Sequence, residues 1–310
     1  MSLVETEWLE KNLDSVKIID CSWHMPQTKR NGFDEYKKQH IPNTIFFDLD
    51  DNSKKNTNLP HMLIEINNWE KIISKMGIKN DDKIIIYDNS DVISSCRCWF
   101  NFIYFGHDPK LIHVLNGGLK KWIKEKRKIT NDSTDIQISN YKSFEKKELV
   151  KNKKLIDENI NTQKFKVIDA RSKERFEGKV SEPRKGLRSG NIKNSFCIPF
   201  NLCLNDDKTF KNKEELKNVF QSCLKNINEK NIVFSCGSGV TACVLALAFS
   251  LINDVTSSLG SIWPVGGRLA EASAMSTRGF VTSMWWVKYS ATSSEKTDHV
   301  QARSAVFEID

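Results

Sequence analysis

The chain has 310 residues, enough for two ordinary domains of about 150 residues, each with its own core. Hydrophobic residues make up 39% and charged residues 28%, a composition typical of globular proteins rather than disordered ones. The formal net charge is +8, but most of the excess is lysine scattered with asparagine through apparent loops. We therefore expect solvated faces and no nucleic-acid partner.

The sequence also indicates the cellular compartment. It has no apolar run of the about 18 residues that a membrane span needs, so we expect no membrane partner. Residues 1–8 are acidic and lack an apolar signal core, which argues against secretion. The eight cysteines show no zinc-like spacing and favour a reducing compartment. We expect a cytoplasmic protein without metal or other cofactor, with the mitochondrion as the alternative.

In chain order, short β-branched runs alternate with helical patterns, which is typical of a mostly parallel sheet covered on both faces. The first half has expected strands at 16–20 and 83–88 and expected helices at 68–76, 98–105 and 118–125. The second half has expected strands at 165–169 and 231–236 and expected helices at 213–225 and 239–252. We predict an α/β fold.

The second half also echoes the first. The run Val-Lys-Ile-Ile-Asp at 16–20 recurs as Phe-Lys-Val-Ile-Asp at 165–169. Pairing Asp20 with Asp169, Ile41 with Ile192 and Asp88 with Cys236 gives offsets of 149, 151 and 148. Because chance matches would scatter, we predict two copies of one domain, at 1–132 and 159–253. The polar stretch at 133–158 is the predicted linker.

The strongest local signal follows the strand at 231–236, where Cys236 precedes a glycine-spaced turn and an apolar helix. Sites in open α/β sheets form beyond the carboxyl ends of strands, where Cys236 stands. Gly237 and Gly239 let the backbone turn its N–H groups inward as an anion-binding nest, and the helix N-terminus adds about half a positive charge. Both effects favour the thiolate, so we predict Cys236 as the nucleophile.

The run Cys-Gly-Ser-Gly-Val-Thr-Ala-Cys at 236–243 resembles the active-site loop of 3-mercaptopyruvate sulfurtransferases, which belong to the two-domain rhodanese family. Thiosulfate sulfurtransferases resemble it too, but carry basic residues where this chain has Gly237 and Ser238. A related phosphatase loop would need arginine six positions after the cysteine, where this chain has Ala242. Further matching blocks extend over residues 4–252.

This resemblance implies two tandem rhodanese-like domains, each a mostly parallel sheet flanked by helices. It implies a sulfurtransferase that moves sulfur from 3-mercaptopyruvate through a Cys236 persulfide to a thiol, thioredoxin or cyanide acceptor and releases pyruvate. Two alternatives stay open. One is transfer from thiosulfate to cyanide, and the other is a non-catalytic rhodanese-like binding module.

The resemblance also implies roles for particular residues. Arg175 and Arg184 match the two arginines that hold the substrate's carboxylate and keto oxygen, and the planar fork of arginine suits a carboxylate. We interpret Arg171 instead as half of an ion pair at a strand end. The remaining predicted substrate-binding residues are those of the loop itself, Gly237, Gly239, Val240 and Thr241.

A second implied group is a proton relay. Asp48, His61 and Ser238 match positions that form a hydrogen-bonded relay in the family, in which a histidine oriented by an aspartate moves a proton through the serine. His61 stands in Leu-Pro-His-Met-Leu, at 59–63, which is one of the matching blocks. We therefore predict Cys236, Ser238, His61 and Asp48 as the catalytic residues.

Two regions depart from the family's pattern. The first copy has Asp88 where the second has Cys236, so it cannot carry a persulfide there, and we expect it to complete the cleft from the other side. After Asn253 the composition changes abruptly, because asparagine is absent from 254–310 and only Lys288 and Lys296 represent lysine. We expect 254–310 to be an atypical tail, either disordered or misread sequence, which would deprive the second domain of a strand and a helix.

Overall fold

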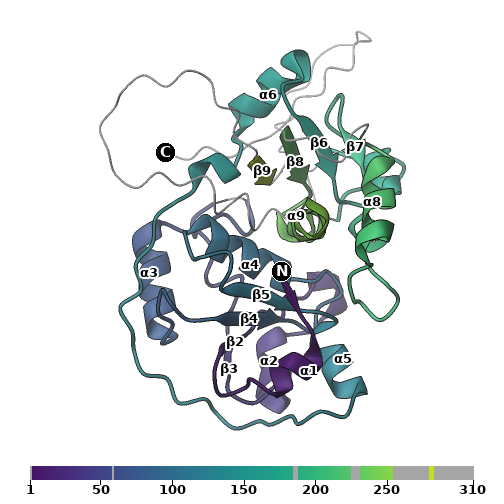
Figure 1. Cartoon of the computed structure of the whole chain (residues 1–310). Helices are drawn as coiled ribbons and strands as arrows, with labels where there is room; N and C mark the ends of the chain where they lie inside the picture. The colour runs from purple at the N-terminus through teal and green to yellow at the C-terminus, as the bar shows by residue number, and fades with distance from the viewer. Residues whose placement is uncertain (1, 58, 184–187, 225–230, 254–278, 283–310) are drawn as a thin grey trace.

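The computed structural model describes residues 2–57, 59–183, 188–224, 231–253 and 279–282. Over these residues the two halves of the chain build two parallel sheets with helices between and around them (Figure 1). The predicted class, tandem α/β domains on mostly parallel sheets, is confirmed. None of the helices in the described part of the chain combines the length and apolar character that a bilayer crossing requires.

The first half forms a five-stranded sheet in the order β1-β5-β4-β2-β3, with every neighbouring pair parallel. Its strands are Leu3–Val4 (β1), Lys17–Asp20 (β2), Thr44–Phe46 (β3), Ile84–Tyr87 (β4) and Ile112–Leu115 (β5). Its helices are Thr6–Glu10 (α1), Gly32–Lys38 (α2), Ile66–Lys75 (α3), Ser95–Tyr104 (α4) and Gly118–Lys124 (α5), with a 3-10 turn at Pro26–Thr28 (η1). The three helices expected here are thus present, with ends that differ from the prediction by at most three residues.

The second half forms a four-stranded parallel sheet in the order β7-β6-β8-β9. Its strands are Lys166–Asp169 (β6), Phe196–Cys197 (β7), Asn231–Ser235 (β8) and Gly279–Thr282 (β9). Its helices are Lys153–Thr162 (α6), Lys173–Phe176 (α7), Lys213–Gln221 (α8) and Val240–Asn253 (α9), with 3-10 turns at Lys147–Leu149 (η2) and Phe200–Cys203 (η3). Helix α6 begins inside the stretch that we predicted as linker.

The connectivity of the two sheets confirms the predicted repeat. The neighbours β5-β4-β2-β3 of the first sheet correspond to β9-β8-β6-β7 of the second. In the register of the first sheet Asp20 lies beside Tyr87, and in the second Asp169 lies beside Ser235. Asp88 and Cys236, one residue further on, therefore leave their sheets at equivalent points.

Strand β9 comes from the segment that we expected to be an atypical tail. It pairs in parallel with β8 and takes the place that β5 has in the first sheet. The expectation that the second domain would lack this strand is therefore wrong for 279–282, because tertiary pairing with β8 supplies a position that composition does not reveal. The other tail residues, 254–278 and 283–310, lie outside the described residues.

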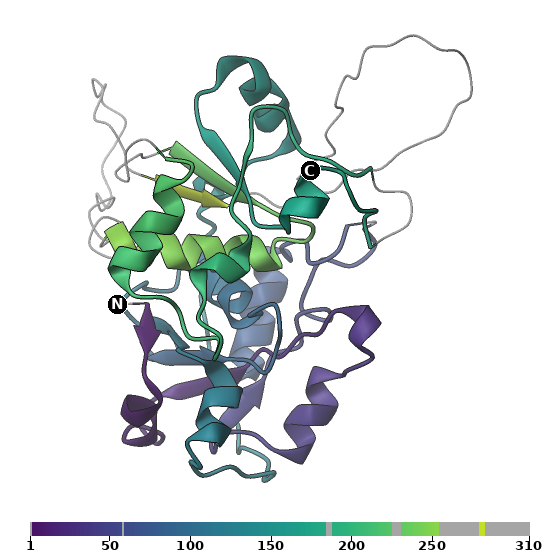
Figure 2. The same cartoon turned by 90° about the vertical axis from the view of Figure 1, so that its right-hand side faces the viewer.

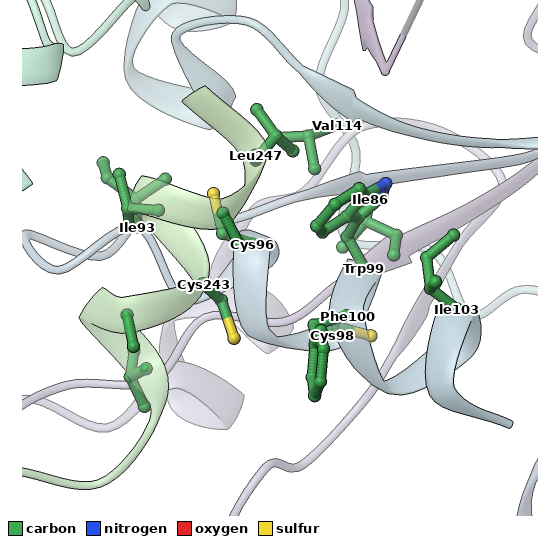
Figure 3. Packing of buried hydrophobic residues seen from close by; sticks show 14 of the residues in the cluster. Ile86, Ile93, Cys96, Cys98, Trp99, Phe100, Ile103, Val114, Cys243 and Leu247 are labelled. Carbon is green, nitrogen blue, oxygen red and sulfur yellow. The ribbon is translucent and has the colours of Figure 1, made fainter. Parts of the chain in front are cut away.

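Helices α4 and α9 pack against each other between the two sheets (Figures 1 and 2). Every residue of α4 is buried, including Arg97 and Asn101, because the helix is enclosed between the two sheets. Cys96, Trp99 and Phe100 of α4 and Cys243 and Leu247 of α9 lie in one hydrophobic cluster that spans both domains (Figure 3). This continuous core holds the first domain against the helix that follows Cys236.

Candidate active site

The turn at Cys236 is as short as the sequence suggested. Cys236 follows directly on β8, and α9 begins at Val240. Gly239 has a φ of +76°, a left-handed conformation that glycine adopts without the steric cost of a Cβ. Its N–H donates a hydrogen bond to Sγ of Cys236 at 3.0 Å. The turn thus aims a backbone donor at the sulfur, as an anion-binding nest requires.

The Cys236 residue lines a cleft of about 310 Å³ to which both domains contribute. The first domain supplies Trp23, Met25, Gln27 and Val92. The predicted site residues that line it are Cys236, Gly237, Ser238, Val240, Thr241 and Arg175. Gly239 contributes through its N–H to the sulfur, and Arg184 lies outside the described residues. The structure therefore brings together the predicted loop and one of the two predicted arginines.

Arg175 stands beside the loop on α7. A Cβ added to Gly237 would lie 3.3 Å from Nη2 of Arg175, so the missing side chain leaves room for the guanidinium. Nε and Nη2 donate to Oε1 and Oε2 of Glu182 at 3.2 and 2.5 Å. Within the described part of the chain, no acceptor takes a hydrogen bond from Nη1 of Arg175. Nη1 can therefore donate a hydrogen bond to an anionic ligand.

Glu182 is a site residue that the sequence argument did not single out. Its side chain is only 4% exposed, and Oε1 also accepts a hydrogen bond from Nη1 of Arg171 at 2.9 Å. Arg171 in turn donates to both carboxylate oxygens of Asp169 at 2.7 to 3.0 Å, which confirms the expected ion pair at the strand end. Glu182 thus orients two guanidinium groups on one wall of the cleft. The only signal in the sequence is its position two residues before Arg184 in a matching block.

The predicted relay needs a correction. Nε2 of His61 lies 2.8 Å from Oδ1 of Asp50, not beside Asp48. The Asp48 carboxylate instead accepts the N–H of Asp51 at 2.9 Å, which closes the turn after β3 and directs that side chain into its own loop. Partial burial opposes ionisation of Asp50, but hydrogen bonds from His61 and Trp23 hold the pKa of its carboxyl below its usual value.

Trp23 connects this pair to the cleft. Its indole N–H donates to Oδ2 of Asp50 at 2.9 Å, and its ring meets the His61 ring edge-on at a centroid distance of 4.8 Å. Trp23 lines the cleft, whereas His61 and Asp50 are not among its described lining residues. The pair therefore stands behind the first-domain wall of the cleft.

Cys236 is the only cysteine among the described lining residues. Burial raises the pKa of the Cys243 thiol, on α9, to about 12, and the pKa of Cys203 to about 12 as well. These neighbouring sulfur atoms stay neutral thiols at physiological pH. Among the described residues no group of three or more His, Cys, Asp or Glu side chains is arranged to hold a metal ion.

Comparison with known protein families is decisive for the fold and its class. The family model described as "Rhodanese-like domain" matches this chain twice, over residues 5–125 and 152–262. The chain belongs to the rhodanese family. Its two sheets are therefore tandem rhodanese-like domains, as the resemblance of the loop implied.

Curated relatives in this family are sulfurtransferases. Thiosulfate/3-mercaptopyruvate sulfurtransferase 1, mitochondrial, of Arabidopsis thaliana is 38% identical over 270 residues, which cover 79% of this chain and 70% of the relative. The 3-mercaptopyruvate sulfurtransferase of Mus musculus is 31% identical and covers 79% of this chain and 84% of the relative. The thiosulfate sulfurtransferase of Rattus norvegicus is 32% identical, with 80% and 85% covered.

The solved structures agree. The crystal structure of SseA from Escherichia coli, a 3-mercaptopyruvate sulfotransferase by its description, aligns with a TM-score of 0.74 and 27% identity. The alignment covers 83% of this chain and 96% of that chain. Together with the curated relatives, this similarity makes the present rhodanese-family chain a sulfurtransferase.

Proposed function

We propose that this sulfurtransferase takes sulfur from 3-mercaptopyruvate, carries it as a persulfide on Cys236 and releases pyruvate. The observation that carries the proposal is the placement of Cys236. Its sulfur accepts the N–H of Gly239, and the residue lines the same cleft as Arg175. A nucleophilic sulfur and a carboxylate-binding cation thus share one cavity.

The transfer balances without an outside oxidant. The Cys236 thiolate attacks the sulfur of mercaptopyruvate, an S–S bond forms and the C–S bond breaks. The electron pair of that bond moves to the methylene carbon, where the neighbouring keto group delocalises it, and a proton completes the methyl group of pyruvate. Arg175 would hold the carboxylate so that the donor sulfur faces Cys236. Arg184 stays a predicted partner for the keto oxygen.

For the proton we propose a relay of Ser238, His61 and Asp50. Ser238 lines the cleft beside Cys236, and His61 is oriented by its hydrogen bond to Asp50. A histidine held by a carboxylate can store and return the proton that the leaving carbon needs.

The charge of the cleft supports mercaptopyruvate as the donor. Its described lining residues carry two guanidinium groups, Arg171 and Arg175, and one carboxylate, Glu182, which binds both. Because Asp169 also pairs with Arg171, these charges balance, and the single carboxylate of mercaptopyruvate would be held by hydrogen bonds from Arg175. Thiosulfate carries two negative charges, and Gly237 and Ser238 provide no further cation on the loop.

Thiosulfate is the second candidate donor, because the similar proteins include enzymes named for each donor. In both cases we propose that a thiol, thioredoxin or cyanide removes the outer sulfur, in the cytoplasm or the mitochondrion. Both donors are small molecules that fit a cleft of about 310 Å³.

One preparation can test the donor. Pyruvate release from mercaptopyruvate is compared with thiocyanate formation from thiosulfate and cyanide, using the wild type, Cys236→Ser and, as a matched control, Cys223→Ser. Cys223 is not among the described residues of the cleft. We expect pyruvate release to dominate, to vanish in Cys236→Ser and to persist in Cys223→Ser. Faster thiocyanate formation would favour thiosulfate, and no turnover with either donor would favour a non-catalytic binding module.

A further inference from the structure

Arg97 is a buried cation of the first domain that reaches into the second. It is the third residue of α4 and has no solvent exposure. Its Nη1 donates to the carbonyl oxygen of Ser238, in the loop that carries Cys236, at 3.1 Å. Its Nη2 donates to the carbonyl oxygen of His61, and its Nε donates to Oδ1 of Asn101 at 2.8 Å. One guanidinium therefore joins three segments from both domains.

The contact to Ser238 has a consequence for the sulfur. The carbonyl of Ser238 and the N–H of Gly239 belong to the same planar peptide group and, in a trans peptide, point in opposite directions. Arg97 grips the oxygen at one end of this group, and the N–H at the other end is the one that donates to Sγ of Cys236. Holding the oxygen fixes the direction of the N–H. A cation on the oxygen also polarises the group and strengthens the N–H as a donor.

We propose that Arg97 is a positioning residue of the sulfur-transfer site, which aims the N–H of Gly239 at Cys236 and thereby favours an anionic sulfur. Its action on the thiolate does not require a particular donor. Its action on the persulfide rests on the function proposed above. Arginine suits this place, because its planar fork serves two carbonyl oxygens at once and it keeps its charge when buried.

The charged and titratable groups around Arg97 agree with this role. Burial lowers the pKa of the Arg97 guanidinium, and the cysteines near it, Cys243, Cys236, Cys21 and Cys98, would oppose this effect only as thiolates. Arg171 is a second cation near Cys236, although its main partners are Asp169 and Glu182. His61 contributes its backbone oxygen to Arg97. Cys236 is thus one of the titratable groups near this cation.

The test is the pH dependence of alkylation at Cys236, followed by mass spectrometry of its peptide in folded protein. Arg97→Met removes both the fork and the charge, whereas Arg97→Lys keeps the charge alone. The matched control is Arg127→Met, which removes a first-domain arginine that pairs with Glu10 and Glu125. We expect the alkylation midpoint to rise by about one pH unit in Arg97→Met, by less in Arg97→Lys, and not at all in the control.

If Arg97 had only a structural role, Arg97→Met would have a lower unfolding temperature, but Cys236 in the protein that remains folded would keep the wild-type alkylation midpoint. That result would overturn the proposal. If Arg97→Met does not fold, Arg97→Lys and Asn101→Ala decide by the same measurement. Asn101→Ala removes the acceptor that holds Nε and leaves the charge in place. A raised midpoint in either variant supports the proposal, and wild-type midpoints in both overturn it.

Sulfur uptake from mercaptopyruvate, measured on the same preparations, separates this proposal from the proposed function. If the wild type takes up no sulfur, the proposed function is wrong, but the alkylation midpoints still test the role of Arg97. If the wild type takes up sulfur, we expect Arg97→Met to lose about tenfold in kcat with KM within about twofold, because Arg97 is not among the described lining residues of the cleft. A change in KM alone would contradict the role in positioning.

Discussion

After β4 the first domain places Asp88 where the second domain, after β8, places Cys236. The two oxygens of Asp88 accept the N–H groups of Ser90 and Ser95 at 2.7 and 2.8 Å, so this carboxylate is bound inside its own loop. The sulfur of Cys236 accepts one N–H, from Gly239, and the residue lines the cleft. Both loops are built to hold an anion. In the first loop the backbone N–H groups bind the carboxylate of Asp88 itself. In the second loop the sulfur of Cys236 faces the cleft, where a ligand can reach it.

The two loops also differ in the residue that adopts a positive φ. The second loop uses Gly239 at a φ of +76°, where glycine fits without strain. The first loop has Ile93 at a φ of +51°, a conformation that is unfavourable for a β-branched side chain. Ile93 is buried, so packing holds it there. A short glycine turn leaves the sulfur open to the cleft, whereas the longer first loop closes over its own carboxylate.

The largest expected effect separates the two central residues. Cys236→Ser should lower pyruvate release by at least about 10³-fold, because it removes the nucleophile. Asp88→Asn should change the rate by less than about threefold, but should lower the free energy of unfolding by about 1–3 kcal/mol, because the amide nitrogen cannot accept a backbone N–H. Steady-state rates and urea unfolding measure the two quantities. An equal loss of activity in both variants would break the comparison.

Replacing the strand-end carboxylate should have opposite effects on stability in the two domains. Burial raises the pKa of Asp20 to about 7 from an ordinary value of 3.8, although hydrogen bonds from Ser22 oppose this. The raised folded-state pKa contributes stability that is complete below about pH 4 and is lost as pH rises through 7. The wild type should therefore lose about 2–3 kcal/mol of unfolding free energy between pH 5 and pH 8 that Asp20→Asn does not lose.

Asp169 is the control for that experiment, because its carboxylate binds Arg171. Asp169→Asn should lower the free energy of unfolding at pH 8, since the mostly buried guanidinium loses a charged acceptor. Urea unfolding at pH 5 and pH 8 measures both variants. If Asp20→Asn is less stable at pH 8 than the wild type, the account of Asp20 is wrong.

Two arginines, one in each domain, make a finer comparison. Arg175→Met should raise KM for mercaptopyruvate about 10–100-fold, because a charged hydrogen bond to the carboxylate is lost. Arg30→Met removes a first-domain arginine that pairs with Glu35 in the same two-pronged way but is not among the described lining residues of the cleft. Its KM should stay within about twofold of the wild type. Similar KM values for the two variants would show that Arg175 does not bind the donor.

The smallest expected effect concerns the turn itself. Gly239→Ala should lower the free energy of unfolding by about 1–2 kcal/mol, because a Cβ is unfavourable at a φ of +76°. Gly190→Ala is the control, since it also has a positive φ, of +103°, but it is not among the described lining residues of the cleft and has nothing within 4 Å of an added Cβ. Only Gly239→Ala should also slow alkylation of Cys236. An equal alkylation rate in both variants would show that the conformation of the turn does not affect the reactivity of Cys236.

Much of the fold and the central residue could be predicted from the sequence, because their signals are local. Apolar strand runs and the glycines after Cys236 are written in consecutive residues. The choice between Asp48 and Asp50 could not be made in this way, since two carboxylates in one turn differ only in the direction their side chains take. The role of Glu182 and the pairing of β9 with β8 depend on contacts between distant segments.

The central claim is that Cys236 carries sulfur and that its counterpart Asp88 does not. The most direct test is the intact mass and peptide map of the protein after incubation with mercaptopyruvate and no acceptor. The account predicts that the mass of one sulfur atom is added to the peptide that contains Cys236, with one pyruvate released per chain, and that cyanide then removes this mass. Sulfur found on another cysteine, or pyruvate released without any added mass, would contradict it.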